Sequence, residues 1–227
     1  EEVVVPIESL NAISDGFSYE EGATFRVASQ TAYVALIDQA KLKKGESLLV
    51  LGASGGVGSA AIKIGSAVGA QVIAVASSEA KRKHCRLIGA NQDISYDNLS
   101  NEVLQLTAKK GVDVVFDPVG GKIFRESLRC LRWGGKYLVV GFADGEIPVL
   151  PINLVLIKGI SLMGIRAGEY YRRFADREKK GLVKLNQMAE KGLLKPDIYK
   201  SFKLKHAESA LNLLKKREAI GRMVLIP

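Results

Sequence analysis

The sequence contains few residues of the kinds that build metal centres or disulfide frameworks. Among its 227 residues there are 2 cysteines and 2 histidines. Cys85 and Cys130 lie far apart, and neither belongs to a C-x-x-C pair. A zinc site needs three or four suitable ligands, so none can be assembled from this chain alone. We expect two reduced, partly buried thiols.

Long apolar runs are also missing. A helix that crosses a bilayer needs about 20 consecutive apolar residues. The apolar stretch 149–157 is interrupted by Pro151 and Asn153, so we expect no membrane association. The chain starts at Glu1, without an initiator Met or a signal-like segment. We therefore expect a chain trimmed at its start, from a cytoplasmic protein, with a mitochondrial location as the alternative.

Acidic residues are outnumbered by basic ones. The chain has 33 Lys and Arg against 24 Asp and Glu, a net charge of +9. Such an excess fits nucleic-acid binding, or solvated helices around a site for a polyanionic cofactor. The basic residues are spread in short clusters, with no aromatic-interleaved RNA-binding motif among them. This pattern favours the cofactor over nucleic acid as the main partner.

One segment stands out among those that are present. The apolar run 47–51 leads into a glycine-rich turn, which opens an alanine-rich helical segment. Ala53-x-Gly55-x-x-Gly58 fits the dinucleotide fingerprint G-x-G-x-x-G, with Ala in place of the first Gly. Glycines let the backbone approach an anion, and free N–H groups at the helix start point toward it. The turn therefore predicts a dinucleotide site, and hence a redox enzyme.

Two other interpretations of this turn stay open. Gly52-x-Ser54-x-Gly56 also fits the nucleophile elbow G-x-S-x-G of serine hydrolases. Such an elbow follows several strands, whereas only about fifty residues precede this one. The turn could also be a purely structural connection between a strand and a helix.

Beyond the turn, apolar segments alternate with segments of helical period. The predicted strands span 47–51, 71–76, 93–96, 112–117, 135–142 and 159–165, and the predicted helices between them span 57–68, 79–87, 102–109 and 124–131. This alternation predicts an α/β fold, a doubly wound parallel six-stranded sheet with helices on both faces.

Further elements are expected on either side of this sheet. A short helix capped by Ser18 and a helix over 28–40 precede it. Charged helices over 170–191, a strand over 201–204, a helix over 207–217 and a strand over 223–226 follow it.

The end of the second predicted strand bears on the identity of the coenzyme. NAD sites usually place an Asp or Glu about 20 residues beyond the glycine turn, on the ribose 2′-hydroxyl. Ala76-Ser77-Ser78 stands there instead, with Glu79 beyond it and Lys81-Arg82-Lys83 following. Hydroxyls and a lysine would bind a 2′-phosphate that a carboxylate would repel. We therefore predict NADPH rather than NADH, although Ser77-Ser78 can also cap the next helix.

At this point the chain resembles the medium-chain dehydrogenase/reductase superfamily, and within it the zinc-free quinone oxidoreductase (zeta-crystallin-like) group. The resemblance covers essentially the whole chain. It rests on Thr31-Ala32-Tyr33, Ala53-Ser54-Gly55-Gly56-Val57-Gly58, Asp117-Pro118-Val119-Gly120-Gly121, Gly141-Phe142-Ala143 and the closing Gly221-Arg222-Met223-Val224-Leu225-Ile226-Pro227.

The resemblance implies contacts for the cofactor but no catalytic residue. Those expected at the pyrophosphate are Ser54, Gly55, Gly56 and Val57; those at the 2′-phosphate are Ser77, Lys81 and Tyr96; those at the nicotinamide end are Thr31, Phe142 and Ala143. Val27 stands where zinc-dependent relatives carry a cysteine, so no metal is expected. Asp117 is expected to shape the turn before Pro118 rather than to act as a catalytic acid.

The resemblance also implies how the chain is divided. Residues 1–27 would end an N-terminal GroES-like catalytic domain, 28–167 would form the NADP-binding Rossmann domain, and 168–227 would return to the catalytic domain. Most of that N-terminal domain would be absent, so we expect NADPH binding with poor turnover. The edge of the sixth strand implies a homodimer.

The expected activity is transfer of hydride from NADPH to a small electrophile, a quinone or an α,β-unsaturated carbonyl. One alternative is a 2-enoyl thioester reductase. Another is a nucleotide- or RNA-binding protein with little turnover. Fold alone does not choose between them, because one fold hosts many activities.

Overall fold

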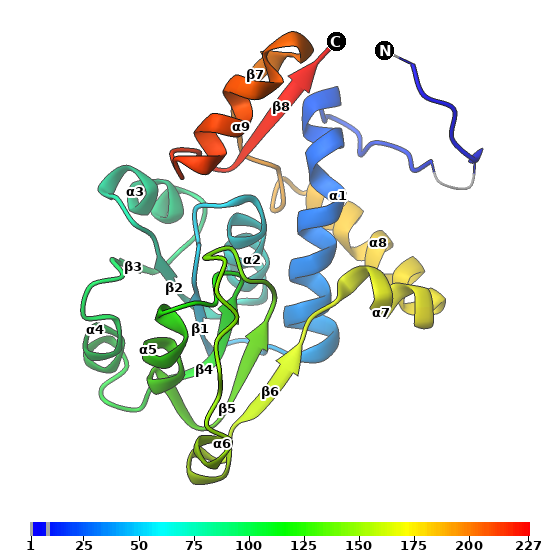
Figure 1. Ribbon diagram of the computed structural model, residues 1–227. Coiled ribbons are helices and arrows are strands. Elements are labelled where there is room, and N and C mark those ends of the chain that lie inside the picture. Colours follow the sequence, from blue (N-terminus) through cyan, green and yellow to red (C-terminus); the bar gives the residue numbers. More distant parts are fainter. Residues whose placement is uncertain (1, 8–9) are drawn as a thin grey trace.

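The computed structural model describes residues 2–7 and 10–227. Its centre is a parallel sheet of six strands in the order β3-β2-β1-β4-β5-β6 (Figure 1). The strands are β1 (Ser47–Val50), β2 (Gln71–Val75), β3 (Gln92–Ile94), β4 (Val112–Asp117), β5 (Leu131–Val139) and β6 (Ser161–Gly164). This is the order of a doubly wound dinucleotide-binding fold: β1 to β3 follow one another toward one edge of the sheet, and β4 to β6 follow one another from β1 toward the other edge. The predicted fold class is confirmed.

The two faces of the sheet are both buried. Leu48 and Val50 of β1 belong to the core on the face that α1 (Tyr19–Tyr33) and α2 (Gly56–Val68) cover. Leu49 belongs to the core on the opposite face, with α4 (Leu99–Leu106) and α5 (Ile123–Arg129). Successive side chains of a strand point to opposite faces, so a strand covered on both sides is apolar throughout.

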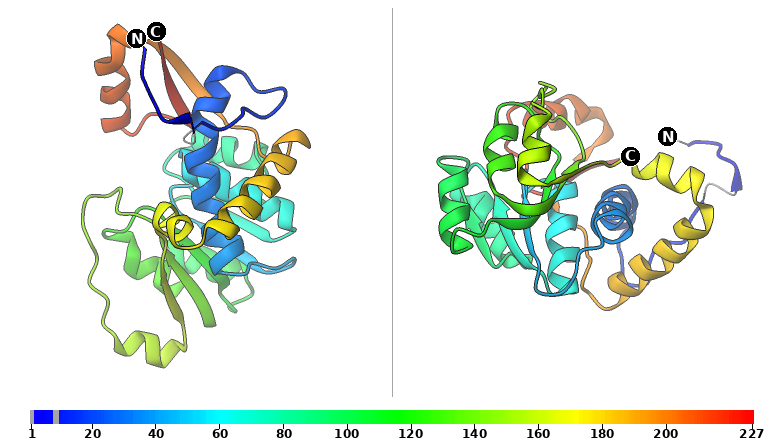
Figure 2. Two further views of the ribbon diagram at one scale, coloured as in Figure 1. Left: turned by 90° about the vertical axis from the view of Figure 1, so that its right-hand side faces the viewer. Right: turned by 90° about the horizontal axis from the view of Figure 1, so that it is seen from below.

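The remaining elements extend this three-layer arrangement. They are the π-helix η2 (Val34–Gln39), α3 (Glu79–Leu87), α6 (Asn153–Lys158), α7 (Ala167–Arg173), α8 (Ala175–Glu190), β7 (Ile198–Lys203), the 3₁₀ turn η3 (Leu204–His206), α9 (Ala207–Lys215) and β8 (Arg222–Ile226). Strands β7 and β8 pair in parallel as a separate small sheet. This sheet and α9 lie together at one end of the molecule, outside the six-stranded sheet (Figure 2).

Two predicted helices differ from those observed. The expected short helix after Ser18 and the expected helix over 28–40 form one continuous helical run, α1 followed by η2, because no proline interrupts it. The helix predicted over 102–109 instead spans Leu99–Leu106. It ends early because Ala108 and Lys109 adopt positive φ angles.

The fifth strand and its following loop also differ from expectation. Strand β5 starts at Leu131 rather than residue 135 and ends at Val139 rather than residue 142. A register shift between Val112 and Val114 accommodates Gly134, whose φ is +74°, within the strand. Helix α6 occupies the segment expected to be a loop. The residues Phe142 and Ala143 consequently lie in a loop beyond the strand.

The predicted domain boundary between residues 27 and 28 falls inside α1. Part of the N-terminal segment assigned to the other domain, residues 1, 8 and 9, lies outside the described residues. The division into domains stays a prediction. In the part of the chain that the structure describes, no helix is long and apolar enough to span a bilayer.

Candidate functional site

The glycine-rich turn follows β1 at the point where the two halves of the sheet meet. Gly52 has a φ of +57°, and its N–H donates to the Tyr96 hydroxyl at 2.8 Å. A Cβ on Gly58 would collide with the Gly52 carbonyl oxygen and lie 2.8 Å from Cα of Ala53. Helix α2 therefore approaches the turn more closely than a side chain at Gly58 would permit.

The start of α2 has the properties of an anion site. Gly55 is its N-cap and supplies no side-chain oxygen, and its first turn contains no acidic residue. The amide groups at the beginning of a helix lack partners within that helix, and the helix dipole places positive potential there. Backbone N–H groups at Gly56 and Val57 could thus hold a phosphate.

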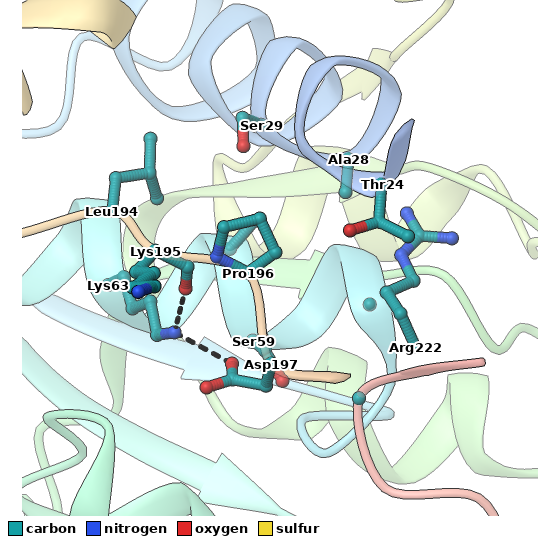
Figure 3. Close-up of a pocket in the computed structure, with 13 residues that line it drawn as sticks. Thr24, Ala28, Ser29, Ser59, Lys63, Leu194, Lys195, Pro196, Asp197 and Arg222 are labelled. Atoms are coloured by element: carbon teal, nitrogen blue, oxygen red, sulfur yellow. Dashed lines mark hydrogen bonds and ion pairs between the residues drawn. The ribbon is translucent and has the colours of Figure 1, made fainter. Parts of the chain in front are cut away.

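Arg222 adds a positive charge at this helix start. A Cβ on Gly56 would lie only 2.5 Å from Cδ of Arg222, so the arginine side chain lies directly against that glycine. The side chain extends toward Thr24 of α1 (Figure 3). Its Nε is buried without a hydrogen-bond partner among the described residues, and burial lowers the pKa of the guanidinium.

The main chain next to Arg222 is attached to the turn. Gly221 N–H donates to the Ser54 carbonyl oxygen at 2.7 Å, and Gly221 forms a bridge with Gly55. Gly221-Arg222 belongs to the closing motif of the sequence, from which no role was predicted for Arg222. Its position beside α2 could not be inferred, because 165 residues separate Arg222 from Val57 along the chain.

A diphosphate suits this arrangement of residues. The turn presents unpartnered amide groups, the glycines leave room for a close approach, and Arg222 has an unsatisfied buried donor. Buried polar groups are normally hydrogen-bonded, so an orphaned arginine donor at a helix start indicates an anionic ligand.

The residues predicted for the 2′-phosphate gather at the ends of β2 and β3. Lys81 Nζ lies 3.4 Å from Ser77 Oγ and also donates to the carbonyl oxygen of Arg217. Burial, followed by the charge of Arg217, lowers the pKa of Lys81. Arg217, for which no role was predicted from the sequence, brings a second cation from the C-terminal tail to this point. Its guanidinium also lies 3.1 Å from Asp144.

The nearest carboxylate to this cluster in sequence is engaged elsewhere. Glu79 accepts from Arg82 at 2.8 Å and from Arg86 at 2.6 Å. Hydrogen bonds from Arg86 and then Arg82 lower the pKa of Glu79. Ser78 caps α3 by accepting from the N–H of Lys81 at 3.4 Å, which confirms the capping role that the sequence left open.

Tyr96 has a structural contact that was not anticipated. Its hydroxyl oxygen accepts the Gly52 N–H and so supports the glycine turn from β3. Burial raises the pKa of Tyr96, and the charge of Arg217 opposes this shift. The hydroxyl proton is not used by this bond and stays available for an anion, so the predicted 2′-phosphate contact stays a prediction.

The loops after β4 and β5 pack on each other at the carboxyl end of the sheet. Asp117 Oδ1 accepts the N–H groups of Val119 and Gly120 at 2.7 and 2.9 Å, and its Oδ2 accepts the Tyr137 hydroxyl at 2.6 Å. The carboxylate is therefore occupied in shaping the turn, as expected. Ala143 N–H in turn donates to the Pro118 carbonyl oxygen at 3.0 Å.

Phe142 and Thr31, both predicted at the nicotinamide end, make few contacts with the other predicted site residues. Phe142 is 41% exposed and lies over Gly120, where a Cβ would be 2.8 Å from its ring. Thr31 Oγ1 donates to the Val27 carbonyl oxygen of its own helix at 2.8 Å. The described contacts join Phe142 and Ala143 to the β4 loop, but they do not join Thr31 to the glycine turn.

The nucleophile-elbow interpretation does not fit the surroundings of Ser54. Ser54 is buried, and no hydrogen bond links its hydroxyl to a histidine among the described residues. Cys85 and Cys130 are free and buried, and burial raises the pKa of each thiol to about 12. Across residues 2–7 and 10–227, no group of three or more His, Cys, Asp or Glu could hold a metal ion.

Comparison with known sequences identifies relatives of the whole chain. The profile of the zinc-binding dehydrogenase family matches residues 56–183, more than half of the chain. The quinone oxidoreductase-like protein 2 homolog of Nematostella vectensis is 33% identical over 99% of this chain and 62% of its own length. Quinone oxidoreductase-like protein 2 of Rattus norvegicus is 34% identical over 99% of this chain and 65% of its own. The chain thus spans less than two thirds of these relatives.

Solved structures have the same fold. A Pseudomonas syringae quinone oxidoreductase is 30% identical with a TM-score of 0.86, over 95% of this chain and 67% of that one. An NAD-dependent alcohol dehydrogenase is 29% identical with a TM-score of 0.85, over 99% and 64%. CurK enoyl reductase is 26% identical with a TM-score of 0.86, over 98% and 67%.

A mycobacterial protein solved in complex with NADPH shares the fold, with a TM-score of 0.89 at 24% identity, over 95% of this chain and 67% of that one. Given the matched profile, the quinone oxidoreductase-like relatives and the parallel sheet, the chain belongs to the zinc-binding dehydrogenase family, within the quinone oxidoreductase-like group of the medium-chain dehydrogenases/reductases.

Proposed function

We propose that this chain is the coenzyme-binding part of an NADPH-dependent reductase that reduces a quinone or an α,β-unsaturated carbonyl without zinc. The observation that carries the choice of NADPH is the cluster of Ser77, Lys81 and Arg217 at the end of β2. Cations and hydroxyls suit a 2′-phosphate. The carboxylate that would disfavour it, Glu79, is paired with Arg82 and Arg86.

In this proposal each part of the site holds one part of the coenzyme. Ser54, Gly55, Gly56, Val57 and Arg222 hold the diphosphate, Ser77, Lys81, Tyr96 and Arg217 hold the 2′-phosphate, and Thr31, Phe142 and Ala143 border the nicotinamide. The reduced nicotinamide, when bound, supplies the hydride. The chain's own residues bind and orient it: Asp117 fixes the β4 loop against which the segment carrying Phe142 and Ala143 is hydrogen-bonded.

The acceptor follows from what the chain offers the substrate. Val27, which stands where zinc-dependent members carry a cysteine, has no ligand atom. Without a metal to polarise a carbonyl, positioning and exclusion of water must suffice. An already activated conjugated acceptor requires less assistance than a simple alcohol or ketone. A 2-enoyl thioester is the second candidate, favoured by the likeness to CurK enoyl reductase.

The coenzyme assignment is tested by Lys81→Glu. Loss of a charge-assisted contact costs about 1.5–3 kcal/mol, which is roughly ten- to hundredfold in affinity. We expect the Kd for NADPH, measured by calorimetry, to rise by at least that factor while the Kd for NADH changes little. Lys83→Glu, an exposed residue of the same helix with the same change of charge, is the matched control. Equal weakening of NADPH and NADH by Lys81→Glu would contradict the assignment.

The acceptor is tested by supplying NADPH with a quinone, an enone or an enoyl thioester and following coenzyme oxidation. We expect the quinone or enone to be reduced faster than the thioester by a longer protein that includes the segment preceding this chain in its relatives. We expect slow turnover by the 227-residue chain itself. Preference for the thioester would favour the second candidate instead.

The resemblance to the quinone oxidoreductase group also implies a homodimer formed through β6. Within the described residues β6 pairs with β5 along one edge, so its other edge is open to a second copy of the chain. Two such edges related by a twofold axis would extend the sheet across the interface.

A further inference from the structure

A largely buried ion pair joins α2 to the segment that precedes β7. Lys63 Nζ donates to Asp197 Oδ2 at 2.7 Å and also to the carbonyl oxygen of Lys195 (Figure 3). The two charged side chains are only 12% and 23% exposed. Lys63 belongs to α2, whereas Lys195 and Asp197 precede β7, so the pair attaches the C-terminal tail to the helix whose start forms the anion site.

Asp197 is bound to the start of β8 through its main chain. Its carbonyl oxygen accepts the N–H of Arg222 at 2.7 Å. Gly221 packs against Asp197 so closely that a Cβ there would lie 3.0 Å from Cβ of Asp197. One residue thus contacts Lys63 with its carboxylate and Arg222 with its backbone.

These contacts also connect to the glycine turn, which leads back to Lys63 through α2. Gly221 N–H donates to the Ser54 carbonyl oxygen at 2.7 Å, and the turn continues directly into α2, which carries Lys63. The backbone of Arg222 is therefore fixed from two sides, by Asp197 and by the turn. Its side chain has no hydrogen-bonding or ionic partner among the described residues, so the backbone attachments and packing against Gly56 determine where the guanidinium lies.

We propose that Lys63 and Asp197 are positioning residues that hold Arg222 at the start of α2 for the coenzyme diphosphate. This inference rests on the proposed function. Breaking a buried ion pair by removing one partner leaves the other charge uncompensated, so the loop with Asp197 would move toward solvent. Arg222, bonded to that loop, would move with it. His84 is the third group at the pair, with Nε2 at 3.8 Å from the same Asp197 oxygen.

The experiment compares two ligands on the purified chain by calorimetry. NADPH contains the diphosphate, and adenosine 2′-monophosphate lacks it but keeps the 2′-phosphate. We expect Lys63→Met to weaken NADPH about tenfold and to leave the nucleotide monophosphate unchanged, since only one of them reaches Arg222. Lys63→Arg should restore most of the affinity. In an Arg222→Met background, Lys63→Met should cause no further loss.

Each other outcome has a definite meaning. Equal weakening of both ligands would indicate a general structural role and overturn the proposal, as would full additivity of Lys63→Met and Arg222→Met. Unchanged NADPH binding in Lys63→Met would overturn it while leaving the proposed function intact. If the unmutated chain bound no NADPH, the proposed function itself would fail. Should Lys63→Met not fold, as judged by circular dichroism, Asp197→Asn, which preserves shape, is held to the same expectations.

Discussion

Gly58 shows how a single residue sets the geometry of the site. A methyl group there would meet the Gly52 carbonyl and lie 2.8 and 2.9 Å from two backbone atoms of Ala53. Since both neighbours are backbone, neither can rotate away, and α2 must shift. We expect Gly58→Ala to lower the free energy of unfolding by about 1–3 kcal/mol and to weaken NADPH binding.

Urea denaturation and calorimetric titration measure these two effects of Gly58→Ala. The matched control is Gly168→Ala, because nothing lies within 4 Å of a Cβ at that position. Because Gly168 lies in α7, we expect Gly168→Ala to leave the free energy of unfolding unchanged or to raise it by up to about 1 kcal/mol. A Gly58→Ala chain as stable as the control would contradict the close approach of α2 to the turn.

At the same scale, His84 makes stability depend on pH. Burial, the largest cause, lowers its pKa; the charge of Lys63 acts in the same direction and that of Asp197 in the opposite one. Below the ordinary histidine pKa of about 6.5 the unfolded chain binds a proton that the folded chain does not. The stability that His84 contributes by staying neutral in the folded chain is therefore fully present above that pH. The free energy of unfolding declines as the pH falls through and below it.

We expect His84→Gln to reduce the loss of stability on going from neutral pH to about pH 5, as measured by urea denaturation at each pH. His206→Gln, which changes an exposed histidine of the tail, is the control. Since both variants retain every carboxylate, acid titration of those groups cancels in the comparison. Identical pH profiles for His84→Gln and His206→Gln would show that His84 is not responsible.

At the scale of elements, α1 depends on a reciprocal cap. Ser18 Oγ accepts the Glu21 N–H at 3.2 Å, and the Glu21 carboxylate accepts the Ser18 N–H at 2.8 Å. The same carboxylate lies 3.0 Å from Lys195 of the tail. A helix start with its amides satisfied resists fraying. The cap therefore supports the long helix that packs on α2.

We expect Ser18→Ala to lower the free energy of unfolding by about 1 kcal/mol. Ser18→Asp, whose carboxylate can accept from the same amide, should retain most of the stability. Urea denaturation of both variants gives the comparison. A loss in Ser18→Asp as large as that in Ser18→Ala would mean that the hydroxyl acts in some way other than capping.

For the whole molecule, the open edge of β6 predicts that two copies of the chain form a dimer. Leu162 on this edge is 44% exposed in the single chain. We expect light scattering to give twice the chain mass, and Leu162→Lys to shift the protein to the monomer, because a charged residue on an edge strand opposes pairing. Leu106→Lys on α4, also 44% exposed, should leave the dimer intact. If the unmutated chain were a monomer, the proposed dimer interface through β6 would be wrong.

Much of the sheet could be predicted because its signals are local. The strand Val112–Asp117 and the helix Glu79–Leu87 have the predicted bounds, since an apolar period and a following Pro or Gly act over a few residues. The start of β5 and the presence of α6 could not be predicted. They depend on a register shift against β4 and on packing with residues distant in sequence.

Local sequence specifies the alternation of the six strands with the helices α2 to α5, the glycine turn and the lack of a carboxylate after β2, because each depends on neighbours along the chain. Tertiary folding brings Arg217 to Lys81, Arg222 to the glycine turn and Lys63 to Asp197. These contacts join residues up to 166 positions apart, as from Gly56 to Arg222. Side chains so distant meet through folding of the whole chain, and no local periodicity records their approach.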